Sequence, residues 1–307
     1  MPGPTVVSPS WDAGPSVGLP MTPGEVGAVL AGPLVDAGWL FDHLGDVSVV
    51  DVRWYLRGAS GREAYERGHI PGAHFVDLDR DLAAPPSAEQ GRHPLPSPET
   101  FAHALGRLGI AEGQPVVAYD DVGGSVAARL WWLLRTVDQP VAVLDGGLAS
   151  WSHPLSVEVP RPEPVVRTRR PWRPSDSVDA DTVAAIGRNI TVLDARSVER
   201  YRDGDPSIDP RPGHIPGAGS APWQDNLDPA SGRFLPPDQL RARYLDLGVR
   251  PEGPTIVYCG SGVTACHDLL ALDVAGFAST CLYPGSWSQW AADAGRPAET
   301  GGPVATT

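Results

Sequence analysis

Cysteine, positive charge and long apolar runs are all scarce in this chain, and each scarcity narrows what the protein can be. Only three of the 307 residues are cysteines, an odd and low count that argues against a disulfide framework. No run of about 18 apolar residues occurs, so the sequence predicts no membrane span and no membrane partner. Basic residues number 24 against 37 acidic ones. That balance argues against a nucleic-acid partner, which requires clustered positive charge.

The N-terminal end, residues 1–30, is expected to be a flexible tail. Its first 20 residues contain no Lys or Arg and no continuous apolar core, so they do not resemble a secretory signal. Proline, glycine and serine dominate there, as they do in flexible segments. Without an export signal, we expect a cytoplasmic protein.

The sequence has an internal duplication, so that its two halves resemble each other. Matching segments follow one another in the same order and are separated by 139 to 145 residues, which indicates a duplicated domain rather than a short repeat. The pairs are Val49–Arg53 with Val192–Arg196, Gly68–Ala73 with Gly213–Ala218, Val116–Asp120 with Thr255–Cys259, and Gly146 and Trp151 with Gly285 and Trp290.

Strand-like and helix-like patterns alternate within each half. Short apolar, β-branched runs predict buried strands, and the segments between them have helical patterns. This alternation predicts an α/β fold, with a mainly parallel sheet flanked by helices in each half. The predicted strands are 47–52, 115–119, 141–144 and 254–258, and the predicted helices are 100–108, 126–135, 237–245 and 263–274, the last ending at Gly276.

A proline- and arginine-rich segment separates the halves. Residues 154–175 hold little apolar periodicity, so we expect an extended linker there. The sequence therefore predicts one domain over residues 31–153 and a second over residues 176–300.

The segment around Cys259 has the features of a catalytic loop. It lies between a predicted strand and a predicted helix, at the carboxyl end of a strand, where open α/β sheets bind ligands. Gly260 and Gly262 let the backbone curl so that loop amides point at one atom. Such a loop stabilises a thiolate, and we expect Cys259 to be a nucleophile. The alternative, a cysteine buried for packing alone, does not require flanking glycines.

Two other functions for the cysteines, phosphatase catalysis and metal binding, are disfavoured. Cysteine-dependent phosphatases have an arginine six positions after the nucleophile, to clamp phosphate, and this chain has Ala265. Cys259 and Cys266 lack zinc-site spacing, and no second ligand pair follows, so we expect no metal. Cys266 and Cys281 lie in a helical and a strand-like run, and we expect both in the core.

Several conspicuous residues are expected to be structural. His69 and His214 each precede Ile-Pro-Gly, a turn-forming segment, and both halves carry it although only one half has the cysteine. Arg196 recurs as Arg53 in the half without the cysteine. We also expect core or domain-interface positions for the tryptophans, namely Trp131, Trp132, Trp151, Trp287 and Trp290.

The duplicated halves, the paired His-Ile-Pro-Gly-Ala segments and the Cys-Gly-Ser-Gly-Val-Thr-Ala loop together resemble the two-domain rhodanese family. The resemblance covers about residues 31 to 295. The Gly260-Ser261 pair is similar to that of 3-mercaptopyruvate sulfurtransferases, whereas thiosulfate-preferring relatives have basic residues there. The resemblance implies a catalytically silent first domain, and Asp120 indeed occupies the position that matches Cys259.

The resemblance also implies roles for residues outside the loop. It implies a hydrogen-bonded triad of Asp79, His93 and Ser261 near the cysteine, although a surface position for His93 is the alternative. It implies two arginines that bind the substrate carboxylate. Arg200 matches the first, and Arg211 is the best candidate for the second.

The expected reaction moves sulfur from 3-mercaptopyruvate through a Cys259 persulfide to a thiol, such as thioredoxin or a small thiol, or to cyanide, without a cofactor. Gly260, Gly262, Val263 and Thr264 would line the site. A thiosulfate:cyanide sulfurtransferase is the first alternative. It is disfavoured on the expectation that no positive charge lies beside the sulfur. A non-catalytic rhodanese module that only binds partners is the second, disfavoured by the intact loop.

Overall fold

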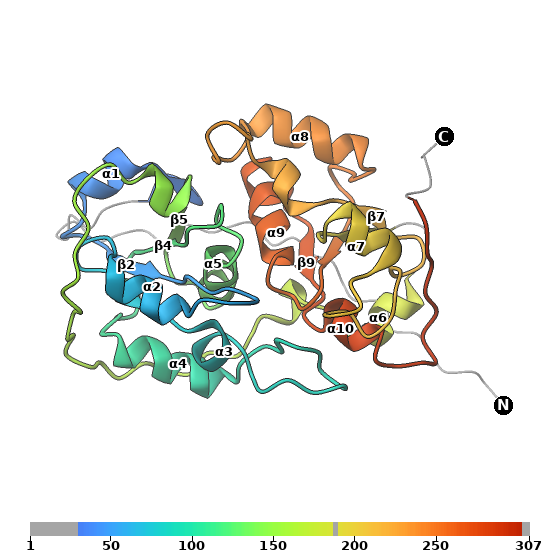
Figure 1. The fold of residues 1–307 in the computed structure, drawn as a ribbon, viewed down its shortest axis with the longest axis horizontal. Helices are drawn as coiled ribbons and strands as arrows, with labels where there is room; N and C mark the ends of the chain where they lie inside the picture. The colour runs from blue at the N-terminus through green and yellow to red at the C-terminus, as the bar shows by residue number, and fades with distance from the viewer. Residues whose placement is uncertain (1–29, 187–189, 303–307) are drawn as a thin grey trace.

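The computed structural model describes residues 30–186 and 190–302. All of the predicted tail except Leu30 lies outside these ranges. The described chain forms two α/β domains side by side, the first blue to green and the second yellow to red in Figure 1. Two domains with parallel sheets flanked by helices were predicted, and this fold class is confirmed.

The first domain is built on a parallel sheet in the order β1-β5-β4-β2-β3. The strands are β1 (Leu34–Val35), β2 (Ser48–Asp51), β3 (His74–Phe75), β4 (Val116–Tyr119) and β5 (Val141–Leu144). The helices are α1 (Ala37–Asp42), α2 (Gly61–Arg67), α3 (Leu78–Asp81), α4 (Pro98–Arg107), α5 (Ala127–Thr136) and the 3-10 turn η1 (Gly147–Ser150).

The second domain repeats this plan with a parallel sheet in the order β7-β6-β8-β9. The strands are β6 (Thr191–Asp194), β7 (Gly219–Ser220), β8 (Thr255–Tyr258) and β9 (Thr280–Leu282). The helices are α6 (Ala180–Ala185), α7 (Val198–Asp203), α8 (Pro237–Asp246), α9 (Ala265–Val274) and α10 (Ser286–Trp290), with 3-10 turns η2 (Pro174–Asp176) and η3 (Trp223–Asn226).

The two domains share one apolar core. Helices α5 and α9 pack against each other (Figure 1), and a continuous cluster of buried side chains runs through both. Trp131 of α5 belongs to this cluster. All five tryptophans expected at core or interface positions are buried. Burial of this kind is the main source of domain association, because apolar contact is favourable in proportion to the area removed from water.

Most predicted elements lie within two residues of the observed ones, and the largest informative difference is at α9. The predicted helix began at residue 263, but α9 begins at Ala265 because the preceding residues curl around the cysteine sulfur. The helix ends as predicted: Gly276 has φ +79° just after it, a conformation that glycine adopts without steric cost.

A buried ion pair fixes the same turn in both domains. In the first domain, Arg53 Nη2 donates to Asp51 Oδ2 at 2.7 Å and to Gly68 O at 2.7 Å. In the second, Arg196 pairs with Asp194 at 2.6 Å and donates to the backbone in the same way. The predicted structural role of Arg196 is confirmed by this repetition.

The two histidines of the repeated turns are also structural. His69 and His214 are buried, and the ring of each stacks on a tyrosine, Tyr65 and Tyr201 respectively. The Nδ1 atom of each is hydrogen-bonded to the carbonyl of that same tyrosine, at 2.8 Å and 3.0 Å. Each ring therefore connects a helix to the following turn rather than facing the cysteine loop.

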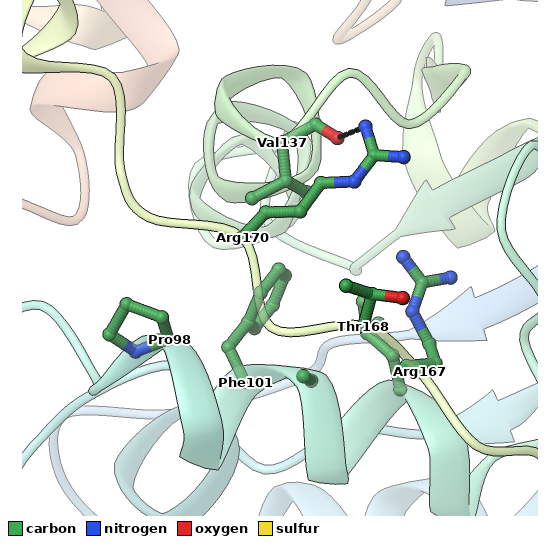
Figure 2. Close-up of a pocket in the computed structure, with 8 residues that line it drawn as sticks. Pro98, Phe101, Val137, Arg167, Thr168 and Arg170 are labelled. Carbon is green, nitrogen blue, oxygen red and sulfur yellow. Dashed lines mark hydrogen bonds between the residues drawn. The ribbon is translucent and has the colours of Figure 1, made fainter.

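The predicted linker lies along the first domain. Residues 151–173, all described, form no helix or strand. The segment is held by bonds such as Val165 N to Gly106 O at 2.9 Å and Trp172 Nε1 to Pro96 O at 3.0 Å. Figure 2 shows the shallow pocket that remains where it crosses α4, with Arg170 bonded to the Val137 carbonyl at 3.2 Å. This pocket holds none of the predicted site residues, so it is not the candidate site.

The loop of the first domain that matches the cysteine loop is closed around a carboxylate. Asp120 is fully buried. Its Oδ1 accepts from Val122 N at 2.9 Å and Gly124 N at 2.8 Å, and its Oδ2 accepts from Val126 N at 2.8 Å and Ala127 N at 2.9 Å. Four convergent amides form a backbone site of the kind that holds an anion, and here the Asp120 carboxyl occupies it. Burial raises the pKa of that carboxyl, and the four amide bonds oppose the rise.

We expect Asp120→Ala to lower the free energy of unfolding by at least about 2 kcal/mol, because it leaves buried amides without an acceptor. Asp121→Ala is the matched control: its exposed carboxylate accepts one bond, from Tyr55 Oη, and the expected loss is under about 1 kcal/mol. Urea unfolding of both variants measures the difference. Equal losses would contradict the account of the Asp120 loop.

Candidate active site

The cysteine loop connects β8 to α9 and wraps around one sulfur atom. Cys259 is only 2% exposed. Its Sγ accepts from Gly262 N at 3.1 Å and, more weakly, from Ser261 N at 3.5 Å. Gly262 has φ +78°, and a Cβ there would lie 2.5 Å from Pro284 O, so only glycine allows the loop to close. The predicted inward-facing amides are present, and they are suited to hold a thiolate.

The other two cysteines have the predicted core positions. Cys266 on α9 and Cys281 on β9 are fully buried. Burial raises the pKa of each thiol to about 12. At neutral pH both therefore stay protonated, and a protonated thiol is a poor nucleophile.

The structure brings Asp79, His93 and Ser261 together, although they come from both domains. His93 Nδ1 is 2.8 Å from Ser261 Oγ, and His93 Nε2 is 3.2 Å from Asp79 Oδ1. Trp54 Nε1 also donates to Asp79, at 2.9 Å. His93 is buried, so the alternative of a surface histidine is wrong.

The protonation of this triad follows from its surroundings. The hydrogen bonds from His93 and Trp54 hold the pKa of Asp79 below its ordinary value, although burial opposes them. An ionised carboxylate only accepts, so His93 Nε2 must carry the proton. Burial lowers the pKa of His93, and the bond to Asp79 opposes this. Neutral His93 then accepts the hydroxyl proton of Ser261 at Nδ1.

Arg200 lies directly beside the cysteine loop. A Cβ added to Gly260 would be 2.8 Å from Arg200 Nη2. Asp209 orients the guanidinium: Arg200 Nε donates to Asp209 Oδ2 at 3.1 Å, and Nη2 donates to Oδ1. Positive charge therefore lies beside the residue that follows Cys259, which was not expected, because the sequence of the loop does not show which side chains fold over it.

Arg211 lies elsewhere. Its Nη2 donates to the carbonyls of Arg296 at 2.6 Å and Asp293 at 3.4 Å, and its guanidinium lies over the Trp287 ring at 5.8 Å. In this segment it is Asp209, not Arg211, that reaches Arg200. The structure therefore does not bring Arg211 to the cysteine loop.

Sequence reasoning missed three charged residues at the site: Arg92, Asp209 and Arg129. Arg92 Nη2 lies 3.2 Å from the Cβ position of Gly260. In the sequence, Arg92 immediately precedes His93, a predicted site residue. That adjacency was the one available signal. Asp209 stood two positions before the arginine that was chosen instead.

Arg129 on α5 ties the two halves of the site together. It is fully buried, and it donates to Gly262 O at 3.0 Å in the cysteine loop and to His93 O at 3.2 Å in the triad segment. Burial lowers the pKa of its guanidinium, while the nearby thiols of Cys266 and Cys259 oppose that shift.

Over residues 30–186 and 190–302, no group of three or more His, Cys, Asp or Glu side chains is arranged to hold a metal ion. None of the helices in these ranges has the length and apolar character needed to cross a membrane.

Comparison with known proteins places the chain in a family. The profile of the Rhodanese-like domain matches twice, over residues 36–154 and 179–293. The chain belongs to the rhodanese family and carries two copies of its domain. The finer boundaries predicted from the sequence stay a prediction.

Individual relatives are similar along nearly their whole length. A Pseudomonas aeruginosa protein provisionally named 3-mercaptopyruvate sulfurtransferase is 45% identical over 266 residues, covering 83% of this chain and 93% of its own. A Mycobacterium tuberculosis protein provisionally named thiosulfate sulfurtransferase SseB is 39% identical over 261 residues, covering 83% and 91%. The crystal structure of the 3-mercaptopyruvate enzyme SseA from Escherichia coli matches with a TM-score of 0.74 and 33% identity, over 84% of this chain and 100% of that one.

We expect His93 to titrate below its ordinary pKa of about 6.5, and Asp79→Asn to lower that pKa further, because the carboxylate stabilises the imidazolium form. NMR titration of the imidazole measures both values. Asp46→Asn, which removes an exposed carboxylate of the same domain, is the control and should leave the His93 pKa unchanged. A higher pKa in Asp79→Asn would refute the assigned pairing.

Proposed function

We propose that this protein is a sulfurtransferase that takes sulfur from 3-mercaptopyruvate and carries it as a persulfide on Cys259. The observation that carries the proposal is the hydrogen-bonded series Asp79–His93–Ser261, which ends inside the loop that holds the nucleophile. Relatives named for this activity support it. The intact loop argues against a module that only binds partners.

In this proposal, the donor is bound through the attraction between its carboxylate and a guanidinium group. The carboxylate of 3-mercaptopyruvate is held by Arg200, whose Nη1 faces the Cβ position of Gly260 at 3.3 Å while Asp209 holds the rest of the guanidinium. A guanidinium and a carboxylate form a strong, charge-assisted pair. Because Gly260 has no side chain, the donor can lie between Arg200 and the sulfur of Cys259.

In the first chemical step, the Cys259 thiolate attacks the sulfur of the donor and an S–S bond forms. The S–C bond breaks, and its electron pair stays on carbon as the enolate of pyruvate. The thiol proton of the donor moves to that carbon, which leaves pyruvate and a Cys259 persulfide anion. Ser261, polarised by neutral His93, is placed to transfer this proton, a contribution of about 10²–10⁴ in rate for positioned acids and bases.

The persulfide is then held by backbone amides. Asp120 in the first domain marks where such a loop binds an anion, through the amides of residues 122, 124, 126 and 127. Their counterparts in the second domain, 139 positions on, are the amides of residues 261, 263, 265 and 266. Four further residues were predicted to line the site, namely Gly260, Gly262, Val263 and Thr264. We keep them in this proposal as residues that shape or line the loop.

In the second step, the acceptor thiol gives its proton to the persulfide anion, and the acceptor thiolate formed in this way attacks the outer sulfur, which becomes the persulfide of the acceptor. The S–S bond breaks, and Cys259 leaves as the thiolate ready for the next cycle. We propose a small thiol, or a thioredoxin-like protein with a protruding cysteine, as the acceptor, because Cys259 is buried and a broad surface could not reach it. A cytoplasmic location belongs to the same proposal.

Thiosulfate is the rival donor, and two observations favour it. Two guanidinium groups lie beside Gly260, which suits a dianion, and the M. tuberculosis relative is named for thiosulfate. Thiosulfate, however, leaves as sulfite without needing a proton on carbon. The triad therefore has a use with mercaptopyruvate that it lacks with thiosulfate, and we propose mercaptopyruvate as the preferred donor.

We expect Cys259→Ser to abolish sulfur transfer, since serine cannot form a persulfide. Cys266→Ser and Cys281→Ser are the matched controls and should keep most of the activity. Intact mass after exposure to donor should show one added sulfur on the wild type and on both controls. An adduct that persists on Cys259→Ser would end the assignment of the nucleophile.

We expect the wild type to prefer mercaptopyruvate over thiosulfate by at least about tenfold in kcat/KM, or roughly 1.4 kcal/mol of transition-state binding. Ser261→Ala should lower turnover of mercaptopyruvate more than that of thiosulfate, since only the first donor needs the proton. Parallel assays with both donors measure each ratio. Equal or better turnover of thiosulfate by the wild type would make the rival donor the correct one.

A further inference from the structure

Two guanidinium groups converge on the missing side chain of Gly260, one from each domain. A Cβ at that position would lie 2.8 Å from Nη2 of Arg200 and 3.2 Å from Nη2 of Arg92. Like charges this close repel each other. Such an arrangement is stabilised by an anion between the groups, and the position next to Cys259 is where the donor must lie.

The two arginines differ in how far carboxylates of the protein neutralise their positive charge. Arg200 has Asp209 as a bidentate partner. Arg92 forms no ion pair with any carboxylate of the described chain, and its side chain makes one bond, from Nη1 to Ile208 O at 3.2 Å. Its Nε is buried without a hydrogen-bond partner. Since buried donors are nearly always satisfied, this guanidinium has donors to offer a ligand.

The charge of Arg92 is also poorly compensated. Burial and the positive charge of Arg200 lower the pKa of its guanidinium, and the opposing negative charges are those of Cys259 and Asp209. Arginine nevertheless stays protonated at neutral pH. An anionic ligand would supply the compensation that the protein does not.

We propose that Arg92, from the catalytically silent domain, is the second donor-binding cation of the site and acts together with Arg200. This inference rests on the proposed function. The ligand class is a small anion, the carboxylate of an α-keto acid or the sulfonate end of thiosulfate, held between the domains with its transferable sulfur toward Cys259. Arg92 takes the part that the sequence had assigned to Arg211.

The position of Arg92 is fixed without its side chain. Its backbone amide donates to Ser288 Oγ at 2.9 Å, and the neighbouring residue His93 is held through its carbonyl by Arg129 at 3.2 Å. Substitution of Arg92 therefore removes the guanidinium and one bond to Ile208, while the backbone contacts between the domains remain.

The test compares Arg92→Ala, Arg92→Lys and the control Arg62→Ala with the wild type, using both donors. Arg62 is an exposed arginine of the same domain, paired with Glu66 on α2. We expect Arg92→Ala to lower kcat/KM by about tenfold or more with each donor, mainly through KM, and Arg92→Lys to regain part of that loss, because charge-assisted bonds contribute roughly this much. Arg62→Ala should stay within about twofold of the wild type.

A binding measurement separates this inference from the proposed function. Pyruvate titrated by calorimetry into Cys259→Ala, with and without Arg92→Ala, should bind about tenfold more weakly without Arg92. If the folded Arg92→Ala enzyme matches the wild type with both donors, or loses only kcat, the inference is wrong and the function stands. If the wild type transfers no sulfur from either donor but pyruvate binding still depends on Arg92, the function is wrong and the anion site stands.

Discussion

A single buried cation sets the relation between the two domains. Arg129 is fully buried, and within the described chain it has no carboxylate partner. Taking a charge out of water costs several kcal/mol unless polar groups surround it, and here backbone carbonyls do so. Those carbonyls belong to residues 82, 93 and 94 of the first domain and to Gly262 of the second. The triad segment and the cysteine loop can therefore satisfy Arg129 only in one mutual position.

The residues of the proposed site are divided between the domains, so the half without the cysteine loop also contributes to it. The second domain provides Cys259, Ser261 and Arg200, whereas His93 and Arg92 come from the first. Neither domain holds a complete set. The shared apolar core along α5 and α9 makes the arrangement permanent, because separating the domains would expose that surface to water.

The sequence was sufficient for the fold and for the tight loop around Cys259, since both are local patterns. The periodic patterns of strands and helices repeat in each half, and the glycines around Cys259 predict a tight loop. What surrounds the loop was predicted less well. Arg211 was chosen by its place in the chain, yet the side chain that reaches the site from that segment is Asp209. Arg92 and Arg129 approach from the other domain, and no spacing within one sequence segment predicts a contact across an interface.

The contrast between the two matching loops has a thermodynamic consequence. In the first domain the amide ring is permanently filled, whereas in the second, within the described chain, only two amides reach the sulfur of Cys259. A group that binds the folded state alone adds to its stability. The proposed Cys259 persulfide stays attached when the chain unfolds, but the loop amides would surround its outer sulfur only in the folded state, so those contacts would have the same effect. The melting temperature of the protein would then report how much of the population is carrying sulfur, and molecules deprived of donor would be the ones that proteases reach first.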